Sequence, residues 1–193
     1  MEKEKLLKIL VVGYGSIGKR HIKNLRNYKN IEIIVLTKKS SDNFLKKEKC
    51  KIVNSIDEAI KEMPDAAFIT NISSQHVNTS LKLAKNRIHL FIEKPLSDSL
   101  KNINQLEKMI KKKKIISQIG CNLRFHPCIK KIRELLIKNY IGESFSVQVE
   151  NGSYLPDWHP HEDYKKSYAS NKKQGGGVIL TNIHEIDYLY WFF

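Results

Sequence analysis

A glycine-rich segment that directly follows an apolar run constrains the fold of this chain more than any other feature. The run is Leu7–Val12, LKILVV, and apart from one lysine it is typical of a strand buried on both faces. Three glycines follow with the spacing G-x-G-x-x-G: Gly13, Gly15 and Gly18. Apolar residues then recur at nearly helical spacing from Ile17 to Leu25. A strand, a glycine turn and a helix in this order predict a dinucleotide-binding unit, and the alternative is a plain tight β–α turn.

Each glycine has a mechanical task in such a turn. Gly13 would turn the chain, Gly15 would let the backbone approach a pyrophosphate, and Gly18 would let the helix pack closely on the strand. The free N–H groups and positive dipole end of the helix would then face the anion. The predicted cofactor contacts in this turn are Gly13, Gly15, Ser16, Ile17 and Gly18.

Strands and helices alternate through the first two thirds of the sequence. Further strands are predicted at Ile31–Leu36, Lys51–Val53, Ala66–Thr70, Ile88–Ile92 and Ile115–Ile119. Helices are predicted from Ser55 to Glu62, from Ser73 or Ser74 to Asn86, and from Ser97 to Lys114. This alternation predicts an α/β, Rossmann-type domain over residues 1–122, with a doubly wound parallel sheet that binds ligands at the carboxyl ends of its strands.

The residues after the second strand bear on the choice of cofactor. An Asp or Glu at this point bonds the adenosine ribose hydroxyls and favours NAD. Here the strand Ile31–Leu36 ends instead in Thr37, Lys38 and Lys39. We therefore expect Thr37 and Lys38 to contact the cofactor. The missing acid favours NADP over NAD only slightly. The alternative to a role of Lys38 and Lys39 in cofactor binding is that they are ordinary exposed loop lysines.

The pattern changes beyond the predicted sheet. An amphipathic helix is expected over Ile129–Asn139, and Ser144–Glu150 alternates apolar and polar residues as a half-buried strand does. A long polar and aromatic loop follows at Gly152–Gln174, and a final helix at Val178–Phe193. Residues 123–193 are thus predicted to begin an incomplete α+β domain.

A strand that ends in Glu93-Lys94-Pro95, downstream of the glycine fingerprint, resembles the Gfo/Idh/MocA family of NAD(P)-dependent sugar and cyclitol oxidoreductases. Further matching segments are Asn122–Pro127 (NLRFHP), Leu155–Tyr168 (LPDWHPHEDYKKSY) and Gly175–Gly177 followed by His184 and Asp187. The motifs span nearly the whole chain. The resemblance implies a second domain that continues beyond Phe193, so we expect this sequence to be the N-terminal portion of such an enzyme. It would be a fragment, a truncated reading frame, or one half that a second polypeptide completes.

The resemblance also implies roles for the first-domain residues near the nicotinamide. Lys94, in a peptide that is often cis in relatives, would exchange a proton with the reacting oxygen and touch the substrate. Glu93 would hold the loop or contact the nicotinamide ribose. Thr70, Asn71 and His76 would lie beneath the cofactor, although a proline common in the family is replaced by Asn71. His76 is either packed near the nicotinamide ribose or a satisfied loop histidine.

Second-domain residues are assigned in the same way. His184 would be the acid–base partner of Lys94, and Asp187, three residues later, would orient its imidazole. Asn122, Arg124, Trp158, His184 and Asp187 are the remaining predicted substrate contacts. Many relatives place an aspartate where this chain has Thr181 and their histidine where it has Glu185, which weakens the predicted proton relay.

Composition excludes several other classes. The net charge is +14, but lysines are spread along the chain and no basic stretch is interleaved with aromatics, so nucleic acid is not expected as a partner. No apolar run approaches the ~20 residues of a membrane helix, and no signal peptide is recognisable, so we expect a cytoplasmic protein without membrane contact. His159 and His161, with Glu162 and Asp163, could suggest a metal, but the resemblance implies none, and none is predicted.

The sequence therefore predicts an NAD(P)-dependent oxidoreductase that transfers a hydride between nicotinamide and a hydroxyl or carbonyl carbon of a sugar derivative. The resemblance implies a homo-oligomer for the full-length form, because the sheet of the second domain often supplies a dimer surface in relatives. The incomplete second domain alone would leave apolar strand and helix faces poorly covered, which predicts association or aggregation. The alternative is a truncated, non-catalytic dinucleotide-binding or regulatory protein of the same fold.

Overall fold

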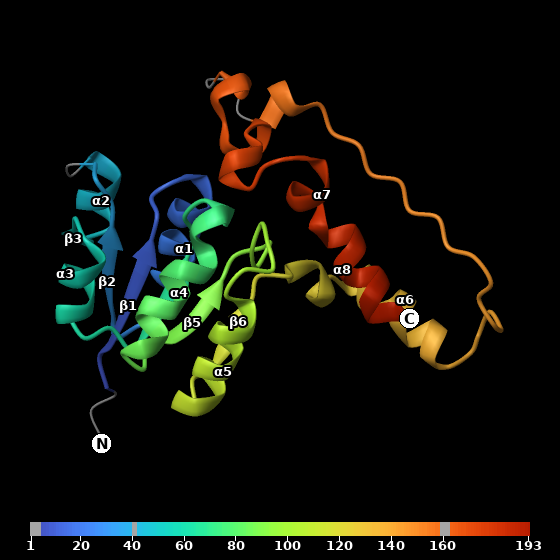
Figure 1. Cartoon of the computed structure of the whole chain (residues 1–193), viewed down its shortest axis with the longest axis horizontal. Coiled ribbons are helices and arrows are strands. Elements are labelled where there is room, and N and C mark those ends of the chain that lie inside the picture. The colour runs from blue at the N-terminus through green and yellow to red at the C-terminus, as the bar shows by residue number, and fades with distance from the viewer. Residues whose placement is uncertain (1–4, 40–41, 159–162) are drawn as a thin grey trace. The chain divides into compact units, whose positions relative to one another are not determined.

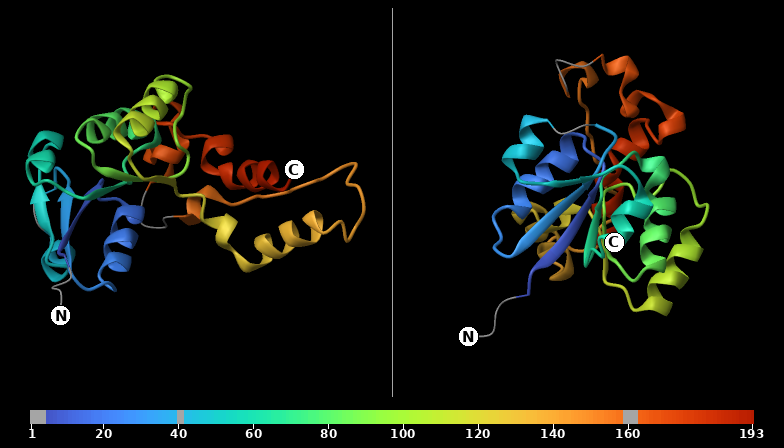
Figure 2. Two further views of the ribbon diagram at one scale, coloured as in Figure 1. Left: turned by 90° about the horizontal axis from the view of Figure 1, so that it is seen from below. Right: turned by 90° about the vertical axis from the view of Figure 1, so that its left-hand side faces the viewer.

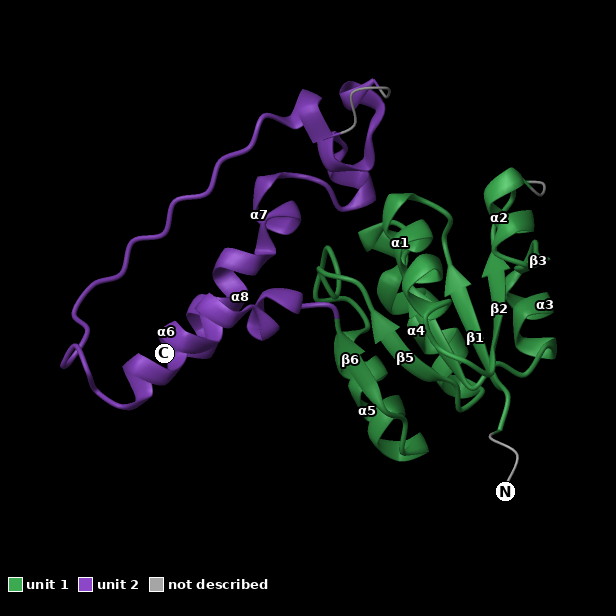
Figure 3. Ribbon diagram, turned by 180° about the vertical axis from the view of Figure 1, so that it is seen from behind, with its two compact units in different colours: residues 1–119 green, residues 120–193 purple. Residues whose placement is uncertain are grey.

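The computed structural model describes residues 5–39, 42–158 and 163–193. The chain divides into two units, residues 1–119 and 120–193, which are coloured separately in Figure 3. The boundary between the two domains predicted from the sequence lies after residue 122.

In the described part of the first unit, six parallel strands form one sheet in the order β3-β2-β1-β4-β5-β6 (Figure 1). The strands are β1 Leu7–Val12, β2 Ile31–Leu36, β3 Lys51–Val53, β4 Ala66–Ile69, β5 His89–Ile92 and β6 Ser117–Ile119. Leu10 of β1 pairs with Ile34 on one side and Ala67 on the other, and its side chain is fully buried. The predicted doubly wound parallel sheet is therefore confirmed.

Helices cover both faces of this sheet, and Figure 2 shows the layers from two further directions. One face packs against α1 (Ser16–Leu25) and α2 (Asn43–Lys47), through an apolar cluster that contains Val11, Ile22 and Leu45. The other face packs against the remaining helices of the unit, through a cluster that contains Leu10, Leu81 and Leu106. These helices are α3 Ile56–Lys61, α4 His76–Lys85 and α5 Ile103–Lys113.

Local capping explains where the helices of this unit start. Ser55 accepts a hydrogen bond from the Glu58 backbone and caps α3 as predicted. The helix expected from Ser73 or Ser74 begins instead at His76, after a 3₁₀ turn over Ser73–Gln75.

The helix expected from Ser97 begins at Ile103, so that prediction is wrong. Asn102 directly before it has φ +64°, a left-handed conformation that no α-helical residue adopts and that Asn tolerates well. The short helix α2 was not predicted. Its cap is Asp42, whose side chain accepts from the Leu45 backbone.

The second unit is mostly helical in its described part. Its helices are α6 Pro127–Ile137, α7 Val178–Thr181 and α8 Ile183–Phe192, with 3₁₀ turns at Asn122–Phe125, Leu155–Trp158, Tyr164–Lys166, Tyr168–Ser170 and Lys172–Gln174. The final helix was predicted as continuous, but it breaks at Asn182.

The strand predicted at Ser144–Glu150 does not form. The segment is assigned to no strand, and the side chains of Phe145, Val147 and Val149 are exposed. Alternation of apolar and polar residues defines the two faces of a strand, but a strand also needs a neighbour for its backbone hydrogen bonds. No described segment of this unit supplies that neighbour.

Candidate functional site

The glycine turn between β1 and α1 has the geometry that its sequence predicts. Gly13 has φ +103°, and a Cβ there would lie 2.8 Å from the carbonyl oxygen of Thr70. A Cβ on Gly18 would collide with the carbonyl oxygen of Gly13. Gly15 differs from both, because a Cβ there would meet no atom within 4 Å. Gly13 and Gly18 are thus required for packing, whereas the space beside Gly15 is open to a ligand.

The first turn of α1 offers donors to that open space. Gly15 is the N-cap residue and carries no side chain to bond the backbone N–H groups of the first turn. Ser16 is exposed and Ile17 half-buried at this end. A helix of this length (10 residues) with an uncapped N-terminus suits a phosphate or pyrophosphate.

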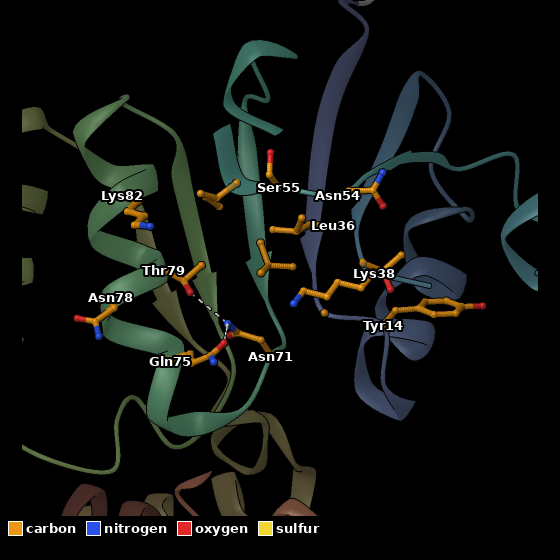
Figure 4. Close-up of a pocket in the computed structure, with 14 residues that line it drawn as sticks. Tyr14, Leu36, Lys38, Asn54, Ser55, Asn71, Gln75, Asn78, Thr79 and Lys82 are labelled. Carbon is orange, nitrogen blue, oxygen red and sulfur yellow. Dashed lines mark hydrogen bonds between the residues drawn. The ribbon is translucent and has the colours of Figure 1, made fainter. Parts of the chain in front are cut away.

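A pocket of about 510 Å³ opens beside this turn, at the carboxyl ends of β1 and β2 (Figure 4). Thr37 and Lys38, which follow β2, line one side, and Asn78, Thr79 and Lys82 of α4 line the opposite side. That Thr37 and Lys38 contact a cofactor stays a prediction. Among the described residues that line it, two are lysines and none is Asp or Glu. The pocket therefore favours an anionic ligand.

Thr70 and Asn71 follow β4 and connect the glycine turn to the pocket. The Thr70 hydroxyl donates to the carbonyl oxygens of Val12 and Gly13, at 2.9 and 3.2 Å, so it supports the turn. The Asn71 amide nitrogen donates to Thr79 Oγ1 at 3.1 Å. Its oxygen is buried without a hydrogen-bond partner among the described residues, and it remains an acceptor for a ligand hydroxyl.

His76 is buried, with 1% of its surface exposed. Its Nδ1 lies 2.8 Å from the Pro95 carbonyl oxygen, and its Nε2 lies 2.9 Å from the Asn71 carbonyl oxygen. Both ring nitrogens thus face backbone carbonyl oxygens, and a neutral imidazole donates to one of the two. Of the two roles considered from the sequence, this geometry supports the satisfied histidine.

The Lys94–Pro95 peptide bond is cis, as the resemblance implies. Lys94 is the second residue after the carboxyl end of β5, which is His89–Ile92. The Glu93 carboxylate has two partners: Oε1 lies 2.7 Å from His21 Nε2, and Oε2 accepts from the Lys94 backbone N–H at 3.2 Å. Glu93 therefore holds the loop, which is one of its two predicted roles.

In the second unit, Arg124 and Asp187 form a two-point ion pair. Arg124 Nε donates to Asp187 Oδ2 at 2.8 Å, and its NH2 group donates to Oδ1 at 2.6 Å. These hydrogen bonds from Arg124 hold the pKa of the Asp187 carboxyl below its ordinary value, against a smaller opposing effect of burial. Both Asp187 oxygens thus accept from Arg124, and the carboxylate also interacts with Cys121 and, electrostatically, with His184. The expectation that Asp187 orients the imidazole of His184 stays a prediction.

The other predicted second-unit residues occupy separate elements. His184 is on α8, Asn122 begins a 3₁₀ turn, and Trp158 ends another and donates from Nε1 to Ser153 Oγ at 2.6 Å. Thr181 donates to the Gly177 carbonyl oxygen at 2.7 Å. Glu185, where relatives have the histidine, accepts from the Asn151 amide at 2.9 Å. His184 belongs to a different unit from Lys94, so their pairing stays a prediction.

The family profile described as "Oxidoreductase family, NAD-binding Rossmann fold" matches residues 7–121. The chain belongs to the Gfo/Idh/MocA oxidoreductase family. As a member of this family it carries the glycine turn, the lysine pocket and the cis-proline turn described above within the matched region.

Relatives of this Gfo/Idh/MocA chain act on different compounds. It is 25% identical over 179 residues to 2,7-anhydro-N-acetylneuraminate hydratase of Escherichia coli, covering 92% of this chain and 47% of that protein. It is 27% identical over 187 residues to myo-inositol 2-dehydrogenase of Thermotoga maritima, covering 94% and 53%. The chain thus spans about half the length of the curated relatives it matches.

Solved structures share the fold of the chain. A scyllo-inositol dehydrogenase from Lactobacillus casei, solved with NAD(H) and scyllo-inositol, superposes with a TM-score of 0.79. It is 22% identical, and the match covers 97% of this chain and 56% of that one. GenD2 from gentamicin A biosynthesis, solved with NAD, superposes with a TM-score of 0.76 at 15% identity, covering 97% of this chain and 54% of that one.

Two functional contacts were missed from the sequence. His21 lies on α1 between Gly18 and Ile22, on the helix face that packs on the sheet. Its place on this face of the predicted helix could have indicated a contact with the strand ends. Tyr14 donates from its hydroxyl to Asp42 at 2.7 Å, and Asp42 caps α2. The hydrogen bond from Tyr14 could not be predicted from the sequence, because its acceptor, Asp42, caps a helix that was not itself predicted.

The described residues hold no cluster of His, Cys, Asp and Glu suited to a metal ion. Of the four residues considered above, His159, His161 and Glu162 lie outside the described residues. Asp163 is described, and its Oδ1 accepts from the Lys165 backbone N–H at 3.1 Å. None of the helices described is both long and apolar enough to cross a membrane.

Proposed function

We propose that this chain forms the cofactor-binding part of an oxidoreductase that moves a hydride between nicotinamide and a hydroxyl or carbonyl carbon of a sugar or cyclitol derivative. The observation that carries the proposal is a convergence in the first unit. The open glycine turn, the cationic pocket and the Lys94–Pro95 turn all follow carboxyl ends of strands in one parallel sheet.

The residues at this edge fit a nicotinamide dinucleotide. The space beside Gly15 and the N–H groups of Ser16 and Ile17 suit the pyrophosphate. Thr37 and Lys38 suit the adenosine end, and the unpartnered Asn71 oxygen suits a ribose hydroxyl. When bound, the nicotinamide ring supplies or accepts the hydride.

Lys94 would manage the proton of this reaction. Its ammonium would hydrogen-bond the reacting oxygen, protonating it during reduction and taking the proton during oxidation. Glu93 and Pro95 would fix the backbone on either side of the lysine. His184 would be the second acid–base group, while Asn122, Arg124, Trp158 and Asp187 would contribute to the substrate side.

The substrate class rests on the relatives. Their names include an inositol dehydrogenase, a glucose-6-phosphate 3-dehydrogenase and a 1,5-anhydro-D-fructose reductase, which share polyhydroxylated ring substrates. We extend that class, and no single compound, to this chain. A homo-oligomer is proposed on the exposed apolar side chains of the second unit, such as Phe145 and Tyr190.

The test has two steps. NADH and NADPH are titrated into the protein by fluorescence, and hydride transfer is then measured at 340 nm over a panel of sugars and inositols. Lys94→Met is expected to keep cofactor affinity within about twofold and to lose about 100-fold or more in turnover, the lower range for a general acid–base group. Turnover of Lys94→Met equal to that of wild type would remove Lys94 from catalysis.

A non-catalytic dinucleotide-binding protein is the second candidate. It is favoured by Thr181 and Glu185, which occupy the positions where many relatives have an aspartate and a histidine and which here make structural hydrogen bonds. Binding of NADH or NADPH without turnover of any panel compound would select this candidate.

A further inference from the structure

Two histidines converge on the turn that carries Lys94, from opposite layers of the first unit. His21 is on α1, which packs on one face of the sheet, and His76 begins α4, which packs on the other. Between them lies the segment Glu93-Lys94-Pro95, directly after β5.

His21 acts on the Glu93 side of the turn. Its Nε2 lies 2.7 Å from Glu93 Oε1, and both side chains are largely buried, with 15% and 17% of their surface exposed. The imidazole also contacts the rings of Phe68 and Phe91, at centroid distances of 4.9 and 5.2 Å. Since a carboxylate only accepts, the Nε2–H of His21 must donate, and this fixes the carboxylate whose other oxygen accepts from the Lys94 backbone.

His76 acts on the Pro95 side. Its Nδ1 lies 2.8 Å from the Pro95 carbonyl oxygen, while Nε2 faces the carbonyl oxygen of Asn71 in the loop after β4. A carbonyl oxygen only accepts, so the contact with Pro95 forms when Nδ1 carries the proton. In that tautomer His76 holds the Pro95 side of the turn, and Nε2, which carries no proton, makes no hydrogen bond to the Asn71 carbonyl oxygen.

We propose that His21 and His76 are positioning residues that hold the Lys94 turn from both sides, His21 through Nε2 and His76 through Nδ1. The inference rests on the proposed function of Lys94. It assigns His76 to the turn rather than to direct contact with the cofactor, and it adds His21 to the residues on which the site depends.

Substitution of each histidine by Asn or Gln distinguishes the contact made by Nδ1 from the contact made by Nε2. The nitrogen of an Asn side chain replaces Nδ1 of a histidine, whereas the nitrogen of a Gln side chain approximates Nε2. His21→Gln and His76→Asn should therefore keep the contacts to Glu93 and Pro95. His21→Asn and His76→Gln should lose them while filling similar space.

The experiment is amide hydrogen exchange by mass spectrometry on the whole chain and the four variants. Exchange in peptides covering residues 90–98 is expected to rise about fivefold in His21→Asn and His76→Gln, the effect of one lost hydrogen bond, and to stay near wild type in the other two. Exchange in β1 (Leu7–Val12) reports whether each variant is folded. Gln is thus expected to preserve the contact at position 21, and Asn at position 76. If the two histidines only filled space, the same amide would be preferred at both positions.

Equal behaviour of Asn and Gln at either position would overturn the proposal for that histidine, as would the opposite preference. A fluorescence titration with NADH and NADPH runs beside the exchange measurement. If the wild-type chain bound neither dinucleotide, the proposed function would fail, whereas the exchange pattern would still decide whether the two histidines hold the turn.

Discussion

The guanidinium of Arg124 donates hydrogen bonds to both carboxylate oxygens of Asp187, from Nε to Oδ2 at 2.8 Å and from NH2 to Oδ1 at 2.6 Å. The two residues are 63 positions apart in the sequence. Arg124 is in the 3₁₀ turn that begins the second unit, and Asp187 is on its last helix. Trp191, one turn further along α8, lies 5.6 Å from the same guanidinium. This pair ties the two ends of the unit together, and both residues were predicted as substrate contacts.

The pair makes a prediction about pH. Arg124 lowers the pKa of Asp187, so Asp187 contributes stability above the unfolded-state pKa of about 3.9, and that contribution is lost as pH falls through the lower folded-state value. Carboxyl ¹³C NMR titration should place the Asp187 midpoint below 3.9 in the wild type and return it towards 3.9 in Arg124→Gln. Arg133→Gln, which removes a different guanidinium near Trp191, is the control and should leave the midpoint unchanged. An identical midpoint in wild type and Arg124→Gln would show that the pair does not form in solution.

The glycine turn predicts two different outcomes for the same substitution. Gly18→Ala places a Cβ against the Gly13 carbonyl oxygen, and backbone cannot move aside as a side chain can, so we expect a loss of about 1–3 kcal/mol in the free energy of unfolding. Gly15→Ala meets no atom within 4 Å and should retain the wild-type stability. It should instead weaken NADH and NADPH binding, because the methyl group enters the space proposed for the pyrophosphate. Thermal unfolding and fluorescence titration of both variants check this, and unchanged affinity in Gly15→Ala would place the dinucleotide elsewhere.

The lysines after β2 predict which dinucleotide is preferred. Lys38 lines the pocket, whereas its neighbour Lys39 is absent from the described lining, so the two form a matched pair. Lys38→Ala should weaken NADPH binding about tenfold relative to NADH, the effect of losing one charge-assisted contact to a 2′-phosphate. Lys39→Ala should change both affinities about equally. Equal loss of NADH and NADPH affinity in Lys38→Ala would remove the lysine from recognition of the 2′-phosphate.

The centre of the sheet could be predicted from sequence because β1, β2, β4 and β5 are short, largely apolar and followed by turn residues. The pattern Leu7–Val12 reads as a strand without any knowledge of its neighbours, and the structure gives it the same bounds. The start of α5 could not be found in this way. Ser97 is a good cap in isolation, but the chain stays irregular until Asn102, whose left-handed backbone no local rule required.

Within the candidate site, the residues that act through their backbone conformation could be predicted from the sequence. The hydrogen-bond partners that are distant in the sequence could not. The three glycines act through φ and close approach, which depend on residue type at fixed spacing. The partners of Glu93 and His76 depend on which loops meet at the strand ends, and those contacts join residues 72 and 19 positions apart. The final helix was predicted as continuous over Val178–Phe193, and no local sequence signal indicated the break at Asn182.

The contact between Asp65 and the start of β1 gives a final prediction. Asp65 accepts from the backbone N–H of Lys8 at 2.9 Å and from the Lys5 ammonium at 2.7 Å, and these bonds lower its pKa, with the Lys5 bond contributing most. Asp65→Asn should reduce the free energy of unfolding by about 1 kcal/mol near neutral pH, after allowance for the partial exposure of the carboxylate.

The comparison that isolates the backbone bond is Lys5→Ala, which removes only an exposed ammonium and should cost less than about 0.5 kcal/mol. Because the pKa of Asp65 is lowered on folding, the difference between wild type and Asp65→Asn should hold above about pH 5 and shrink as pH falls below 3.9. Urea unfolding of the three proteins at several pH values measures this. A difference that grew on acidification would contradict the assignment, because it would require Asp65 to be stabilised in its protonated form.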